Sequence, residues 1–97
     1  MQPDQISKNG NIIIDENGSL AQFYSLTNIL SKSRHVRYIS KNDEADNIEW
    51  NFKYRGHPLT LQYNIYNGVC LYARENKDAK AVTDLMEKLR RKNKAIQ

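Results

Sequence analysis

The side chains of this 97-residue sequence that could support nucleophilic catalysis are few and far apart. A cysteine nucleophile needs a base within about 3 Å, and the chain has one cysteine, Cys70, and two histidines, His35 and His57. His57 falls in a predicted turn about six strand positions from the level of Cys70, which is about 20 Å at ~3.3 Å per residue. We therefore expect no Cys–His pair, no catalytic residues and no enzymatic activity.

The ligand spacings of metal and nucleotide sites do not occur in the chain either. A single cysteine excludes an internal disulfide and a cysteine-based zinc site. The neighbouring acids Asp43, Glu44 and Asp46 lack the glycine-containing pattern of a calcium loop, and none of the four glycines lies in a phosphate-binding loop. We expect no metal and no cofactor. A lone cysteine is also typical of a reducing compartment, so we expect a cytoplasmic protein.

The excess positive charge of the chain lies at its C-terminal end. Residues 1–76 carry eight Lys/Arg and eight Asp/Glu, whereas residues 77–97 carry seven Lys/Arg and three Asp/Glu, which accounts for the net charge of +4. Five cations follow one another there without an intervening acid: Lys88, Arg90, Arg91, Lys92 and Lys94. Such a cluster either attracts phosphate or an acidic protein surface, or it complements the dipole at a helix C-terminus.

A second cationic set accompanies tyrosines on the polar side of three predicted strands. Tyrosine and arginine favour protein interfaces, and rings flanked by cations also bind single-stranded nucleic acid. The leading hypothesis is a non-catalytic protein-interaction module, with nucleic-acid binding as the alternative and an ordinary solvated sheet face as a third interpretation. The candidate partner surface comprises Lys53, Arg55, Tyr66, Tyr72 and Arg74 from these strands, and Arg90, Arg91 and Lys92 from the C-terminal cluster.

A period of two between residues 48 and 74 indicates the strands that position this surface. The apolar side chains recur at every second residue in three runs: Ile48, Trp50, Phe52 and Tyr54, then Leu59, Leu61, Tyr63 and Ile65, then Val69, Leu71 and Ala73. Polar residues occupy the alternate positions, as in strands with one wet face. The pattern predicts a three-stranded antiparallel meander.

The register of the two hairpins follows from matching apolar partners across the strands. A four-residue loop at 55–58 would pair Phe52 with Leu61. A three-residue loop with Gly68 in the left-handed conformation would pair Ile65 with Val69 and Tyr63 with Leu71.

Two amphipathic segments would cover the apolar face of the meander. One helix begins after the N-cap Ser19 and runs to about Ser33, and a second begins after Asn76 or Asp78. Residues 36–40 and 12–14 add shorter strands, and residues 41–47 form a polar loop. The sequence therefore predicts an α+β two-layer sandwich of order β-α-β-β-β-β-α, with two helices on one face of a mainly antiparallel sheet of four to five strands. The predicted core is Phe23, Leu30, Trp50, Phe52, Leu61, Tyr63, Ile65, Val69, Leu71, Val82, Leu85, Met86 and Leu89.

The chain length is typical of one domain, which we assign to residues 1–97 with flexible tails at 1–9 and 93–97. Its longest apolar run, residues 12–14, is far shorter than the roughly 20 residues of a membrane-spanning helix. We expect no membrane association. No motif is specific enough to identify a family, a partner or an oligomeric state.

Overall fold

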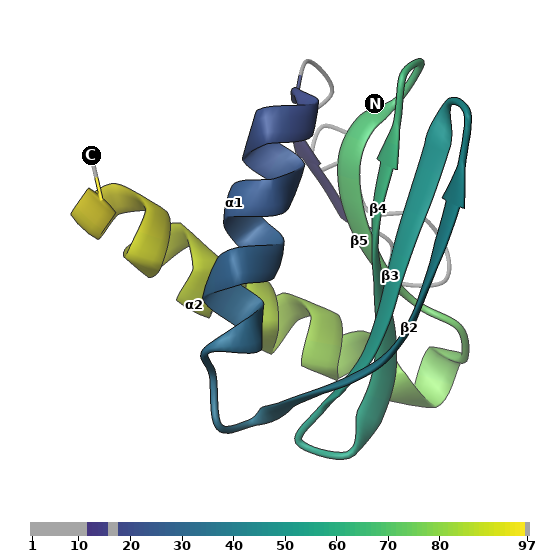
Figure 1. The fold of residues 1–97 in the computed structure, drawn as a ribbon. Helices are drawn as coiled ribbons and strands as arrows, with labels where there is room; N and C mark the ends of the chain where they lie inside the picture. The colour runs from purple at the N-terminus through teal and green to yellow at the C-terminus, as the bar shows by residue number, and fades with distance from the viewer. Residues whose placement is uncertain (1–11, 16–17, 97) are drawn as a thin grey trace, which may run out of the picture.

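A four-stranded antiparallel meander with both helices on one of its faces forms the frame of the molecule in the computed structural model (Figure 1). The structure describes the backbone of residues 12–15 and 18–96 and the side chains of residues 18–91. The meander consists of β2 (Val36–Glu44), β3 (Asn47–Tyr54), β4 (His57–Asn64) and β5 (Gly68–Ala73). The helices are α1 (Leu20–Ser31) and α2 (Ala79–Ile96), the latter preceded by the short helix η1 (Asn76–Asp78). The predicted α+β class, the antiparallel sheet and the two helices are confirmed.

The ends of the chain add one further strand and the last turn of α2. A short strand, β1 (Ile12–Asp15), pairs antiparallel with β5, so the sheet order is β1-β5-β4-β3-β2. The predicted tail at 1–9 lies outside the described residues, and residues 93–96 belong to α2. Neither helix of the described part combines the length and hydropathy of a membrane-spanning segment.

The β3–β4 hairpin is tighter than predicted. Its turn has two residues, Arg55 with φ 52° and Gly56 with φ 87°, and it pairs Phe52 with Leu59 rather than with Leu61. Two successive positive φ angles give a turn whose twist matches that of the flanking strands. The sequence argument missed this turn because arginine rarely adopts the left-handed conformation.

The β4–β5 hairpin also differs by two residues from the predicted register. Gly68 has the expected positive φ, 77°, but the loop comprises residues 65–67, and Tyr63 pairs with Val69. Asn64 begins the turn, because its side-chain oxygen accepts a hydrogen bond from the Tyr66 amide at 2.8 Å. Ile65, a predicted core residue, is therefore in the loop and 54% exposed. The predicted registers of both hairpins are wrong by two residues, and strand side chains alternate with a period of two. The apolar side chains other than Ile65 therefore keep their predicted face.

The edge strand β2 extends through the segment that was predicted as a polar loop. It pairs with β3 as far as Glu44, with one extra residue inserted between Tyr38 and Ser40. This bulge turns Lys41 toward the helices, where its Nζ lies 3.3 Å from the Tyr24 hydroxyl and above the Tyr24 ring. A bulge and an inward-facing lysine are common protections of a free sheet edge.

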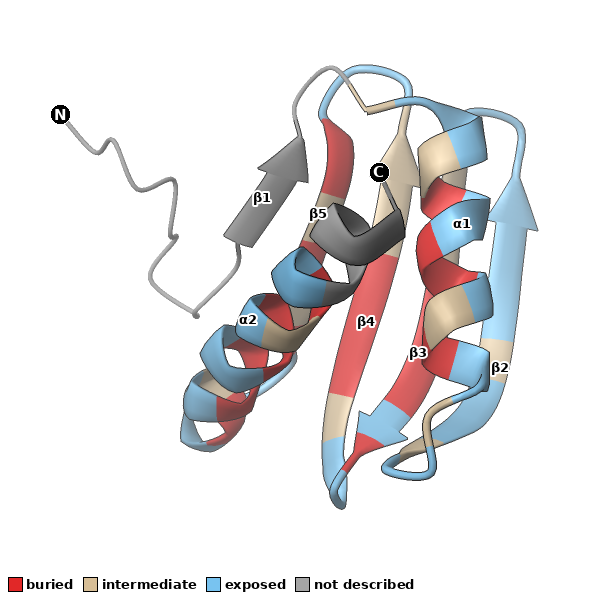
Figure 2. Cartoon of the chain, turned by 90° about the vertical axis from the view of Figure 1, so that its left-hand side faces the viewer, coloured by how far each residue is buried: buried red, intermediate tan, exposed pale blue. Residues whose placement is uncertain are grey.

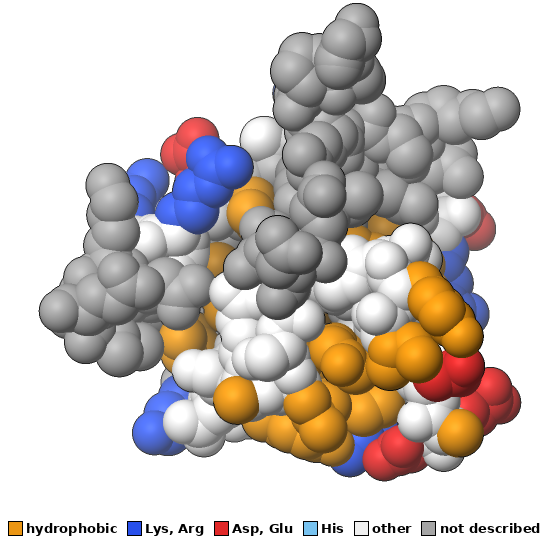
Figure 3. Space-filling model, turned by 90° about the horizontal axis from the view of Figure 1, so that it is seen from above, with side chains coloured by type: hydrophobic (Ala, Val, Ile, Leu, Met, Phe, Trp, Pro, Cys, Tyr) orange, Lys and Arg blue, Asp and Glu red, His pale blue; other side chains and the backbone are white. Residues whose placement is uncertain are grey.

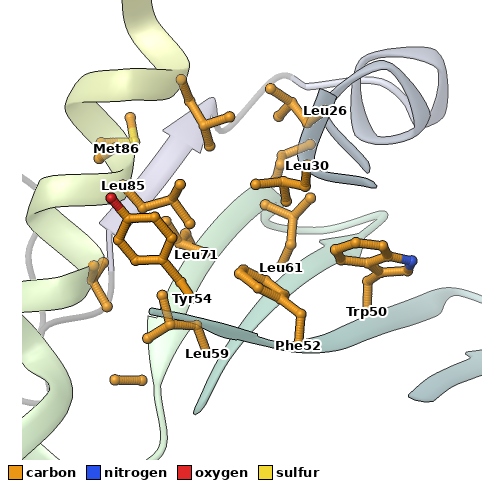
Figure 4. Close-up of a cluster of buried hydrophobic side chains, with 14 of the residues drawn as sticks. Leu26, Leu30, Trp50, Phe52, Tyr54, Leu59, Leu61, Leu71, Leu85 and Met86 are labelled. Carbon is orange, nitrogen blue, oxygen red and sulfur yellow. The ribbon is translucent and has the colours of Figure 1, made fainter. Parts of the chain in front are cut away.

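The core lies between the sheet and the helices. Leu26 and Leu30 of α1 point toward Leu61, and Leu85 and Met86 of α2 lie next to Tyr54 and Leu71 (Figure 4). Figure 2 shows the buried residues on the helix surfaces that face the sheet. Of the predicted core, Ile65 is exposed and Tyr63 is half-buried against the core. The other eleven are buried: Phe23, Leu30, Trp50, Phe52, Leu61, Val69, Leu71, Val82, Leu85, Met86 and Leu89.

The burial of Leu85 in α2 and the exposure of Ile65 in the β4–β5 loop predict how two truncations to alanine affect stability. Leu85→Ala removes a side chain that is 3% exposed, so it should lower the free energy of unfolding by roughly 2 to 5 kcal/mol in chemical denaturation. The control Ile65→Ala acts in an exposed loop and should change it by less than about 0.5 kcal/mol. An unchanged denaturation midpoint for Leu85→Ala would exclude α2 from the core.

Candidate functional site

Cationic side chains form a row across one end of the outer sheet face, the face turned away from the helices. Arg37 of β2 pairs with Lys53 of β3, and Lys53 pairs with Pro58 of β4. Leu59 pairs with Ala73, so in the same register Arg74 comes beside Pro58. Residues paired across antiparallel strands point to the same face, which places Arg37 next to Lys53 and puts Arg74 in the same row, with Pro58 between Lys53 and Arg74.

The loops at this end of the sheet add further cations. The α1–β2 loop contributes Arg34 and the β3–β4 turn contributes Arg55, whose backbone N–H donates to the carbonyl of His35 at 2.8 Å. We call the set Arg34, Arg37, Lys53, Arg55 and Arg74 the basic edge. All five side chains are exposed. An open cleft of about 450 Å³ lies within it, lined by Arg34, His35, Val36, Arg37, Lys53 and Gly56, so no acidic side chain of the described residues lines it.

No side chain of the basic edge forms an ion pair with a carboxylate among residues 18–91. The four ion pairs found there involve Lys41, His57, Lys77 and Arg91, none of which belongs to the set. The hydrogen bond from Tyr54 lowers the pKa of the Asp84 carboxyl, and the positive charges of Lys88 and then Arg55 lower it further, so Arg55 is close enough to that carboxyl to act on it. Like charges directly opposite each other on paired strands destabilise a sheet, and Arg37 and Lys53 are such a pair. Desolvation, together with the positive charges of Arg55, Lys88 and Arg34, lowers the pKa of His35. Among the described side chains, the positive charges of Arg34, Arg37, Lys53 and Arg74 are therefore not paired with a carboxylate.

Hydrogen bonds in the middle of the outer face hold Arg74 in place. Thr60 and Asn51 are buried, and the Thr60 hydroxyl donates to Asn51 Oδ1 at 2.7 Å. Arg74 Nη2 donates to the same oxygen at 3.3 Å, and Asn51 Nδ2 donates to Ser40 Oγ at 3.2 Å. The network spans β2, β3, β4 and the residue after β5, so it fixes one nitrogen of the guanidinium and leaves its other N–H groups for a ligand.

The opposite end of the molecule has the opposite character. Strand β2 ends with Asp43 and Glu44, and the β2–β3 turn carries Asp46. Ile65 and Tyr66 lie exposed in the β4–β5 loop beside this turn, where the Ile65 amide donates to the Asp46 carbonyl at 3.2 Å. Figure 3 shows hydrophobic side chains next to acidic ones on this end. The charge of the molecule thus changes sign along the strands.

The structure brings together only part of the predicted partner surface. Lys53, Arg55 and Arg74 meet at the basic edge. Tyr72 lies in the middle of the outer face with its hydroxyl 3.4 Å from Glu49 Oε2, and burial raises its pKa. Tyr66 is 78% exposed at the acidic end. Arg90 and Arg91 are exposed on α2, in the helix layer, and the side chain of Lys92 lies outside the described residues.

A histidine–aspartate contact beside the basic edge was not found from the sequence. His57 Nδ1 lies 2.7 Å from Oδ1 of Asp78, a buried residue of η1. The two residues are 21 positions apart, and they meet because the two-residue turn starts β4 at His57 and η1 folds back against β4. No spacing pattern in the sequence signals this contact.

Cys70 is separated from the histidine that begins the neighbouring strand. It pairs with Gln62, five residues along β4 from His57, a separation of about 17 Å at ~3.3 Å per residue. Its Sγ contacts Gln62 Oε1 at 3.4 Å, and burial raises the pKa of its thiol to about 11. Within the described residues, no three His, Cys, Asp or Glu side chains gather in a way that could hold a metal ion.

The raised pKa of Cys70 predicts a slow reaction with alkylating agents. With a thiol pKa raised from 9.0 to about 11, the thiolate fraction at pH 8 is smaller by about one to two orders of magnitude. Iodoacetamide should therefore modify the folded protein at least about tenfold more slowly than the protein in denaturant, as followed by mass spectrometry. Equal rates in the two states would show that the thiol is exposed and reactive.

Arg37 and Lys53 carry like charges directly opposite each other, which predicts a substitution that stabilises the free protein. Lys53→Glu replaces a repulsive cross-strand pair by an attractive one, so it should raise the free energy of unfolding by roughly 0.2 to 1 kcal/mol at low salt. The control Lys53→Gln should give a smaller gain, and both gains should shrink at high salt. A less stable Lys53→Glu variant in low-salt denaturation would show that the cations do not repel each other.

Comparison with known proteins identifies a family but no activity. No match was found among curated proteins or among solved structures. A family model described as "Protein of unknown function (DUF3630)" matches residues 2–91, which include the meander, both faces of the sheet and every residue of the basic edge. The chain therefore belongs to the DUF3630 family.

Proposed function

We propose that the protein is a non-catalytic, cytoplasmic interaction module that binds an acidic segment of a partner protein at its basic edge. The observation that supports this proposal is the row of Arg37, Lys53 and Arg74, which has no carboxylate partner among the described side chains. A protein surface that holds repelling charges is complementary to an anion, because the ligand supplies the missing counter-charges.

The spacing of the row matches an extended peptide with acids at alternate positions. Arg37 and Arg74 lie three strand intervals apart, about 14 Å at ~4.8 Å per interval. In an extended segment, carboxylates at positions i, i+2 and i+4 point to one side and span about 13 Å. Such a segment would cross the strands at the basic edge and place one carboxylate near each cation.

The environment of Tyr72 favours a protein partner over single-stranded nucleic acid. Base stacking needs an accessible ring beside the phosphate-binding cations. Tyr72 is half-buried, and its hydroxyl contacts the carboxylate of Glu49, so its ring is poorly accessible for stacking on a base. Nucleic acid remains the alternative ligand because the acid-free cleft at Arg34, Arg37 and Lys53 would also neutralise phosphates.

Fluorescence anisotropy with defined probes tests the proposal. The probes are a labelled peptide of alternating Glu and Ser, its Lys and Ser counterpart, and single-stranded and duplex oligonucleotides of about 12 nucleotides, each at about 50 and 200 mM salt. The Glu peptide should bind, and Arg37→Glu/Lys53→Glu should weaken it by about tenfold or more, as expected when charge-assisted contacts are lost. The matched control Arg90→Glu/Arg91→Glu makes the same change in net charge on α2 and should retain most of the affinity.

Four outcomes would contradict the proposal. Absence of binding of the Glu peptide, or equal losses of affinity for it in the two double variants, would show that no acidic segment is bound at the basic edge. Tighter binding of an oligonucleotide, with a steep fall between the two salt concentrations, would establish the nucleic-acid alternative. A dimer in sedimentation that Arg37→Glu/Lys53→Glu dissociates would show that the acidic turn of a second copy occupies the edge.

A further inference from the structure

A second cleft adjoins the end of the cationic row, where β4, the segment after β5 and η1 meet. Its volume is about 620 Å³, and it is lined by Gly56, by His57 and Pro58 of β4, by Arg74 and Glu75 after β5, and by Lys77 and Asp78 of η1. Arg74 belongs to both this cleft and the basic edge. An acidic segment bound along the row would therefore continue into the cleft.

A buried carboxylate orients the histidine of this cleft. Asp78 is only 4% exposed, and its Oδ1 lies 2.7 Å from His57 Nδ1. A carboxylate at this distance accepts a hydrogen bond from Nδ1–H, which leaves Nε2 as the ring nitrogen that faces a ligand. The His57 side chain is 48% exposed, so half of the ring is accessible from solvent.

The cleft offers three nitrogen-bearing side chains, from β4, the segment after β5 and η1. Arg74 has guanidinium N–H groups beyond the one bonded to Asn51, Lys77 has its ammonium group, and Nε2 of His57 donates when the ring carries both protons. Lys77 pairs with Glu75 at 3.5 Å, but both side chains are mostly exposed, and an exposed pair of this kind contributes little and exchanges partners easily. A phosphate monoester has three acceptor oxygens and a charge between about −1.5 and −2, which matches this donor set better than a planar carboxylate does.

We propose that this cleft binds a phosphate monoester carried by the partner segment, as phosphoserine or phosphothreonine. The inference rests on the proposed function, because the acidic segment at the basic edge brings the phosphate to Arg74. Acidic residues would occupy the row at Arg37 and Lys53, and the phosphorylated residue would follow them in the cleft. Phosphorylation of the partner would then regulate binding.

Isothermal titration calorimetry with three peptides tests this inference. The peptides share one alternating acidic stretch and differ in the residue after it, which is serine, glutamate or phosphoserine. The phosphopeptide should bind about tenfold or more tightly than the serine peptide and more tightly than the glutamate peptide, as one additional charge-assisted hydrogen bond would give. Free phosphoserine and inorganic phosphate should bind far more weakly, because they lack the contacts at the row.

Two substitutions locate the effect. Lys77→Ala removes an exposed donor. His57→Asn retains an amide donor for Asp78 but removes Nε2. Both substitutions should reduce the preference for phosphoserine and leave the affinity for the serine peptide unchanged. Lys80→Ala, an exposed lysine of α2 outside the cleft lining, is the matched control. Thermal melts confirm that each variant is folded.

The results separate this inference from the proposed function. Equal binding of the three peptides, or a phosphoserine preference that survives Lys77→Ala and His57→Asn, would overturn the cleft assignment and leave the basic edge in place. Binding of none of the peptides would overturn both proposals. If inorganic phosphate bound as tightly as the phosphopeptide, the cleft would be a site for free phosphate, and the role of the partner segment would be wrong.

Discussion

The alternation of inward and outward side chains along three paired strands is the constraint on which the rest of the structure depends. Cross-strand pairing aligns Phe52 with Leu59 and Leu61 with Leu71 on one face, and the helices bury that face because its apolar area must leave water. The same pairing aligns Lys53 with Arg37 on the other face. The core and the candidate site are thus two sides of one register, and a slip by a single residue would destroy both.

The outer face has no helix above it and is held by polar contacts instead. Thr60 and Arg74 both donate to Asn51 Oδ1, so residues from three segments are tied into a single arrangement. At the basic edge none of the cations forms an ion pair with a carboxylate among the described side chains. A site that keeps like charges together loses some stability in the free protein, and this loss is expected where a ligand of opposite charge completes the arrangement.

The candidate site was partly predictable. The period of two placed Lys53 and Arg74 on one polar face, and that placement survived two errors in hairpin length because each error shifted the register by two residues. Arg37 was absent from the predicted surface, since β2 was recognised only as a short strand and its pairing with Lys53 depends on the order of the sheet. The contact between His57 and Asp78 required both the tight turn at Arg55 and Gly56 and the position of η1.

The sequence by itself determined the class of the fold, the direction of most strand side chains and the residues of the core, because the periodicity of apolar residues is a local property that burial then enforces. The tertiary structure decided which polar residues became neighbours. Strand order and turn length set those distances, and polar side chains on an open face carry no packing signal that would identify their partners in advance. The basic edge, the bulge that turns Lys41 inward and the oriented histidine of the cleft are consequences of pairing between segments distant in the chain.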